Sequence, residues 1–224
     1  MNWEAIILTA KLATIVSAIL FLIGIPLAYW ISFSKLRFRF LVEAVVALPI
    51  VLPPTVLGYY VLVAISPNSF LGRVYMELFG TTLPFSFQGL VIASVLYSLP
   101  FAVQPFITSF DSVDKKFIEA SWTLGASRVK TFLTIILPLS VPGVVTGLVL
   151  SFAHTLGEFG VVLMVGGNIP GVTRTVSIDI YDKVQALNYQ DAGHTSLFLL
   201  GVSFFVLSIV YLINPVRKGA LRLQ

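Results

Sequence analysis

Long apolar runs recur along this chain, and they constrain its fold more than any other feature. Each run is near or above the roughly 20 residues that cross a hydrocarbon core of about 30 Å. Of the 224 residues, 57% are hydrophobic and only 11% are charged, which is far from the composition of a soluble domain. We therefore predict an all-α integral membrane protein with about five transmembrane helices. The predicted spans are Ile6 to Phe33, Leu41 to Ile65, Gln88 to Phe110, Pro138 to Val165 and Thr195 to Ile213.

The basic residues give the orientation of these spans. Ten of the fourteen lie in the loop after the first span, the loop after the third span and the tail. Since basic residues concentrate in cytoplasmic loops, we predict an external N-terminus and a cytoplasmic C-terminus, as an odd number of spans requires. The ten are Lys35, Arg37, Arg39, Lys115, Lys116, Arg128, Lys130, Arg217, Lys218 and Arg222.

Several functional classes are disfavoured by composition and motifs. The chain has no cysteine, so disulfides, thiolate metal sites and cysteine nucleophiles are excluded. It has no phosphate-binding Gly-x-x-x-x-Gly-Lys-Ser/Thr loop and no Gly-x-Ser-x-Gly turn. The net charge of +4 follows from membrane topology and does not indicate a nucleic-acid partner. We therefore expect a chain that is not an enzyme and that holds neither a metal nor a cofactor, with membrane lipid as its surroundings.

The second predicted span contains three prolines, Pro49, Pro53 and Pro54. Proline lacks an N–H group and breaks the helical hydrogen-bond ladder. Broken backbone at membrane depth is tolerated only where protein buries it or where it lines a wet cavity. We therefore predict that Pro53, Pro54 and Thr55 belong to a pathway or gate, and the alternative is a static proline kink.

Small and ionisable residues follow one another in the fourth predicted span. Gly143, Gly147 and Ser151 are spaced by four, which predicts a face for close helix packing, either within this chain or with a second copy. His154 and Glu158 share a helical face, and ionisable residues at this depth usually face a bundle interior or a wet cavity. We place both near the pathway. Glu158 is expected to be a gate or packing residue, with His154 or nearby backbone as its partner, because a carboxylate repels an anion.

A composite motif follows the third span. It reads Glu119-Ala120-Ser121, three residues, Gly125, nine residues, then Ile135-Ile136-Leu137-Pro138. It resembles the EAA loop of ABC importer permeases and departs from that pattern only at Ser121. By its own chemistry the segment from Val113 to Leu124 predicts a short helix that Gly125 ends in the left-handed conformation. The resemblance implies that this loop, at about 111–138 of a single permease domain spanning 1–224, docks on a separate ATPase subunit. The implied coupling residues are Lys116, Glu119, Ala120, Ser121, Leu124 and Gly125.

Further segments resemble the molybdate and sulfate permeases. They are 48–58 in the second span, 156–160 in the fourth and 167–174 beyond it. This resemblance implies the type I importer permease fold and ATP-driven import of molybdate or tungstate across a prokaryotic cell membrane. It also implies a permease homodimer, two ATPase subunits that bind ATP and Mg²⁺, and an extracytoplasmic molybdate-binding protein that contacts Asn168 and Arg174. A sulfate or thiosulfate permease, a permease heterodimer and a passive oxyanion channel remain open alternatives.

Overall fold

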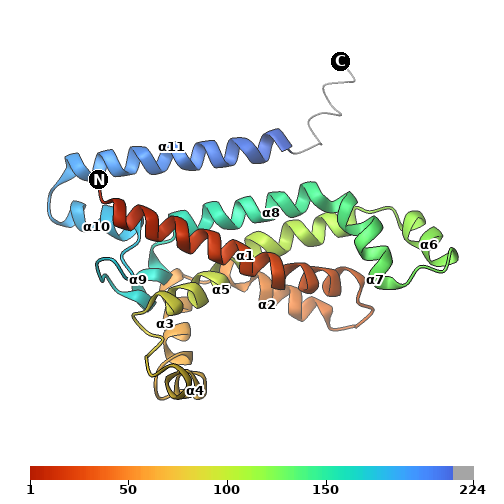
Figure 1. Cartoon of the computed structure of the whole chain (residues 1–224), viewed down its shortest axis with the longest axis horizontal. Coiled ribbons are helices and arrows are strands. Elements are labelled where there is room, and N and C mark those ends of the chain that lie inside the picture. The colour runs from red at the N-terminus through yellow and green to blue at the C-terminus, as the bar shows by residue number, and fades with distance from the viewer. Residues whose placement is uncertain (214–224) are drawn as a thin grey trace.

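A computed structural model describes residues 1–213, and all regular structure in that range is helical (Figure 1). The basic tail residues Arg217, Lys218 and Arg222 lie outside the described residues, so the cytoplasmic location of the C-terminus stays a prediction. The helices are α1 (Trp3–Phe33), α2 (Arg39–Val51), α3 (Pro54–Ala64), α4 (Phe70–Phe79), α5 (Phe87–Asp111), α6 (Lys115–Thr123), α7 (Arg128–Thr131), the π-helical turn η1 (Phe132–Ile136), α8 (Leu137–Gly157), α9 (Gly160–Gly166), α10 (Val176–Gln185) and α11 (Tyr189–Ile213).

The predicted all-helical membrane fold is confirmed, with one broken span. Within the described residues, four helical stretches are long and apolar enough to cross a membrane: α1, α5, α7 to α8, and α11. The pair α2 and α3 meets the same criteria together but is bent by 115°. The second predicted span is therefore not a straight crossing, because Pro53 and Pro54 interrupt its ladder.

Helix α5 is the centre of the bundle. It packs against α1, α8 and α2, and its Phe106 and Phe110 are among the largest fully buried side chains. Gly24 lets α1 approach closely, since a Cβ atom there would lie 3.1 Å from the Phe106 ring. Helix α11 runs along one side of the bundle (Figure 1), where it contacts α8 and α10.

The small residues of α8 pack within this chain. A Cβ atom at Gly143 would lie 2.3 Å from the Cβ atom of Ser109, and one at Gly147 would lie 2.7 Å from the carbonyl oxygen of Ala102. Both contacts are with α5. The close-packing face that the spacing predicts is confirmed, and its partner is α5 of the same chain.

The boundaries predicted for the fourth span, Pro138 to Val165, were wrong at both ends. The helical stretch begins at Arg128, and the helix ends at Gly157. A wide π turn, η1, ends at Ile136, just ahead of Pro138, because Pro138 has no N–H to continue the regular ladder. At the other end Glu158 adopts extended backbone and Phe159 is also non-helical. A separate short helix, α9, then follows.

Candidate functional site

The loop after α5 has defined caps at each turn. The Asp114 side chain accepts a hydrogen bond from the Lys116 N–H (2.9 Å) and begins α6. Gly125 ends it at φ 81°. The N–H of Gly125 donates to the Trp122 carbonyl (2.9 Å) and that of Ala126 to the Ser121 carbonyl (3.0 Å), which together form a Schellman motif. The predicted helix and its glycine stop are confirmed.

One face of α6 anchors the loop to the bundle. Ile118 and Ser121 are buried. The Thr131 hydroxyl donates to the Ser127 carbonyl (3.1 Å), so the 2.8 Å bond between the hydroxyls of Ser121 and Thr131 has Ser121 as donor. Ser121 therefore holds α6 against α7 and does not lie on the outer surface where we expected it. Lys116, Glu119 and Ala120 are exposed.

The outer surface of this loop is strongly apolar. Leu124 is 87% exposed, and three further large side chains that our sequence reasoning did not select are also exposed, namely Phe117, Trp122 and Val129. Such a patch marks an interaction surface. Its signal in the sequence was the presence of aromatic residues in an otherwise charged loop, where solvent contact disfavours them. We call Phe117, Trp122, Leu124 and Val129 the loop patch.

Two helix breaks lie against each other near the outer end of the bundle. One is the α2–α3 break at Pro53, and the other is the α8–α9 break at Glu158. They meet where a Cβ atom at Gly160 would lie 2.8 Å from the Cβ atom of Pro54. Helices α3 and α9 continue this contact. Pro53 and Thr55 are exposed, so this non-helical backbone needs cover from water or protein rather than lipid.

His154 belongs to a hydrogen-bond chain between α8 and α5. The Thr155 hydroxyl donates to the Ser151 carbonyl (2.9 Å), so it must accept from the Ser98 hydroxyl (2.9 Å). Ser98 has then used its only proton and accepts from Nδ1 of His154 (2.9 Å). The chain therefore fixes the histidine proton on Nδ1. The His154 ring is also stacked on Phe101, with ring centroids 3.9 Å apart.

Glu158 does not pair with His154, contrary to our expectation. Its side chain is only 4% exposed, and neither carboxyl oxygen has a hydrogen-bond partner among residues 1–213. Ser94 of α5 lies beside the carboxyl without forming a bond of standard geometry. The cause is the extended backbone of Glu158 at the break, because the i, i+4 relation to His154 holds only in a continuous helix.

On the outer side, Asn168 and Arg174 form a polar cluster with Asp182 of α10. The Arg174 Nε donates to Oδ1 of Asn168 (2.6 Å), and the Asn168 amide donates to Oδ2 of Asp182 (2.6 Å). Nη2 of Arg174 also lies 3.5 Å from that carboxylate. Both predicted docking residues are therefore engaged with each other and with α10.

A second outer cluster is mostly buried. Nζ of Lys183 lies 2.6 Å from Oδ2 of Asp179, and the two side chains are 17% and 6% exposed. Oδ1 of Asp179 accepts from the Asn2 amide (3.0 Å), and Lys183 also donates to the Thr195 hydroxyl (3.3 Å). This cluster ties the start of α1, helix α10 and the start of α11 together. The spacing of Asp179 and Lys183 by four residues suits a helical ion pair, but nothing in the sequence indicated their contacts with Asn2 and Thr195.

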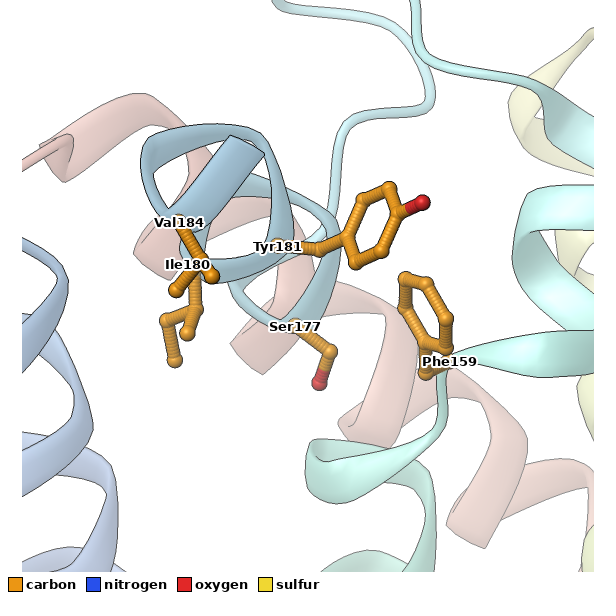
Figure 2. A pocket seen from close by; sticks show the side chains of 5 residues that line it. All are labelled: Phe159, Ser177, Ile180, Tyr181 and Val184. Atoms are coloured by element: carbon orange, nitrogen blue, oxygen red, sulfur yellow. The ribbon is translucent and has the colours of Figure 1, made fainter. Parts of the chain in front are cut away.

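A groove of about 330 Å³ separates α10 from the α8–α9 break (Figure 2). Figure 2 shows Phe159 from the break facing Tyr181 of α10, with ring centroids 5.0 Å apart. The other lining residues are Ser177, Ile180 and Val184. No charged group lines the groove, so it has no features of an anion-binding site.

Comparison with known families identifies the family of this chain. Residues 20–214 match the family described as the binding-protein-dependent transport system inner membrane component. The chain belongs to this family. It is a multi-pass protein of the bacterial inner membrane, and it is the membrane component of its system rather than the ATPase. The family implies that a separate binding protein and a separate ATPase subunit, which binds the nucleotide, work with it.

Individual relatives narrow the comparison. The chain is 47% identical over 215 residues to the molybdenum transport system permease protein ModB of Azotobacter vinelandii, covering 96% of this chain and 95% of that protein. It is 35% identical to ModB of Escherichia coli K12, covering 93% and 91%. A probable sulfate transport system permease protein cysT of Zygnema circumcarinatum is 33% identical, covering 98% and 75%.

Solved structures agree on the fold. The structure of the MetNI methionine ABC transporter in inward-facing conformations matches with a TM-score of 0.75 at 15% identity, and the match covers 96% of each chain. A bacterial ABC transporter that imports alginate matches with a TM-score of 0.68 at 20% identity, covering 95% of this chain and 79% of that chain. The predicted ABC importer permease fold is thereby confirmed.

Proposed function

We propose that this chain is the membrane-spanning permease of an ATP-driven importer that carries molybdate into the cytoplasm. The observation that carries the proposal is the 47% identity to ModB of Azotobacter vinelandii over almost the whole of both chains. Tungstate, a tetrahedral dianion like molybdate, is expected to use the same route.

In this proposal the loop after α5, which carries the EAA-like motif, links the permease to the ATPase. The loop patch, which includes Leu124, sits with Lys116, Glu119 and Ala120 around it on a capped and anchored pair of short helices. Gly125 sets their angle and Ser121 fixes their packing. A rigid, exposed apolar knob with a charged rim is suited to a groove on a partner protein. Movement of two ATPase subunits is then transmitted to the spans.

The two meeting breaks supply the gate. Pro53, Pro54 and Thr55 lie at one break and Glu158 at the other, with His154 one helical turn before it. Outside the membrane, Asn168 and Arg174 form part of the surface on which the binding protein docks. The hydrogen bond from Asn168 to Asp182, and that from Arg174 to Asn168, connect this surface to α10. We place two copies of the permease around a two-fold axis.

The test is uptake of labelled molybdate by cells that lack this chain and by the same cells after its return. Restored uptake that excess tungstate blocks and excess sulfate leaves unchanged supports the proposal. Restored uptake that sulfate blocks would favour the second candidate, a sulfate or thiosulfate permease, for which the 33% identity to the cysT protein speaks. No restored uptake of either anion would contradict both.

A further inference from the structure

A stripe of partly exposed residues runs along α5. Tyr97, Phe101, Gln104 and Thr108 recur at intervals of three and four, so they lie on one helical face. Tyr97 and Phe101 are half-buried, and Gln104 and Thr108 are exposed. Residues on the opposite face, such as Val103, are fully buried. We call these four residues the α5 stripe.

Gln104 is the unusual member of the α5 stripe. Among residues 1–213 its side chain forms no hydrogen bond, whereas the Thr108 hydroxyl donates to the Gln104 carbonyl of its own helix (3.0 Å). At 1.5 Å per residue Gln104 lies about 26 Å from the outer end of α5 and about 10 Å from its cytoplasmic end. An unpaired amide facing hydrocarbon is costly. The α5 stripe therefore faces water or protein.

The border of the α5 stripe is continuous with the proposed gate. Along α8, the His154 ring stacks on Phe101, and the hydrogen-bond chain through Ser98 holds that ring in place. Three residues further on, Gly157 is exposed with open space beside it, just before the α8–α9 break. The surface thus runs from the breaks at the outer end towards Gln104 at the inner end.

Charge at this surface suits an anion. Within the membrane the α5 stripe carries hydroxyl and amide groups and no acidic side chain. Glu158 is buried and presents no carboxylate there. Asp111 continues the same face, but only at the last residue of α5. Oxyanions are bound by hydrogen-bond donors, and the NH₂ group of the Gln104 amide has two N–H donors.

From this arrangement we propose that the α5 stripe is a wall of the aqueous passage for the oxyanion and that the Gln104 amide donates hydrogen bonds to the passing anion. The proposal rests on the proposed import function. It adds a residue that contacts the substrate and defines the course of the passage between the gate and the cytoplasm.

The absence of native cysteine allows a direct test with Gln104→Cys. The assembled transporter, with its ATPase and binding protein, is exposed in membrane vesicles to a membrane-impermeant maleimide from both sides. Two cysteine controls are matched to it. Leu22→Cys replaces a residue on α1 that is 69% exposed at a similar depth, and Val103→Cys replaces a fully buried residue on α5. Because thiolates react and a thiol in lipid does not ionise, Gln104→Cys should react at least about tenfold faster than both controls.

Saturating molybdate should slow the labelling of Gln104→Cys. Labelling no faster than either control would overturn the proposal. So would oxidative cross-linking of two Gln104→Cys copies without maleimide labelling, since that result places Gln104 in an interface between permeases.

Uptake measurements distinguish hydrogen-bond donation by the Gln104 amide from mere exposure of this side chain to water. Gln104→Asn keeps the amide and should retain molybdate uptake, whereas Gln104→Glu places a carboxylate in the passage and should lower it at least about tenfold. Equal uptake by both variants, at equal amounts of assembled complex, would overturn the donor role. If the native chain imports no molybdate, the proposed function fails. If the native chain does import molybdate and Gln104→Cys stays unlabelled, the proposed function stands. Only the assignment of the α5 stripe as a wall of the passage is then contradicted.

Discussion

At the scale of single residues, glycine has two separate uses in this chain. Gly125 provides a left-handed backbone at the end of α6, with nothing within 4 Å of a Cβ atom built there. Gly147 provides space, because a Cβ atom there would meet the α5 backbone and the Phe106 ring at 2.7 Å. Substitutions at the two positions should therefore fail in different ways.

Gly125→Asp should leave membrane insertion and the amount of permease unchanged and abolish ATP-driven molybdate uptake. The added side chain projects into open space where the ATPase is proposed to dock, and the left-handed backbone costs a non-glycine residue about 1–2 kcal/mol. Uptake and co-purification of the ATPase measure the effect. Gly80→Asp is the matched control, because Gly80 is also left-handed (φ 68°) and open but lies outside the loop. Normal uptake by Gly125→Asp would contradict the coupling role.

Gly147→Ala should lower the thermal stability of the purified permease in detergent. The added methyl group meets the Ala102 carbonyl and the Phe106 ring, and overpacking of this kind costs about 1–3 kcal/mol. Gly157→Ala serves as the control because no atom lies within 4 Å of its Cβ position. Equal melting temperatures for the two variants would contradict the prediction, since they would mean that α5 and α8 can move apart at this contact without loss of stability.

At the scale of elements, α10 connects the outer ends of several helices. Asp179 and Lys183 bind α10 to α1 and α11, Asp182 binds it to the loop before it, and Tyr181 contacts Phe159 at the α8–α9 break. Contacts on the outer surface can therefore reach the break through α10.

Asp179→Ala should destabilise the permease by about 3 kcal/mol, because Lys183 is left mostly buried without its carboxylate. The double variant Asp179→Ala with Lys183→Met should recover much of the loss. The exposed pair Arg39 and Glu43 has the same i, i+4 spacing, and Glu43→Ala should change stability by less than about 0.5 kcal/mol. Thermal unfolding in detergent compares them, and a double variant no more stable than Asp179→Ala would contradict the pairing argument.

At the scale of the whole molecule, the bundle buries little of its outer surface. Only 11% of the most apolar stretch of α11 and 33% of that of α1 are buried, because lipid replaces protein as the neighbour of apolar side chains. The uncovered surfaces that need protein or water are the loop patch, the two breaks and the α5 stripe. These are the surfaces to which we assign coupling, gating and passage, respectively.

An importer and a passive channel differ in their need for ATP. Proteoliposomes that contain the permease alone should pass no labelled molybdate. Vesicles that also contain the ATPase and binding protein should accumulate it only when ATP is supplied. Molybdate flux through the permease alone would support the channel alternative.

The sequence determined that lipid surrounds this protein, that its fold is all-helical with four or five spans, that the third span is followed by a short helix with a glycine stop, and which family the chain belongs to. Those features depend on local composition and spacing: apolar length sets the spans, and a left-handed glycine ends α6 wherever the helix lies. Tertiary structure decided the rest. Only the fold showed that Gly147 meets α5, that Ser121 faces Thr131, that His154 bonds Ser98 while Glu158 stays unpaired, and that Asp179 accepts a hydrogen bond from Asn2. These contacts join residues far apart in the chain or depend on where a helix breaks, and a periodic pattern specifies which face is apolar but not which partner covers it.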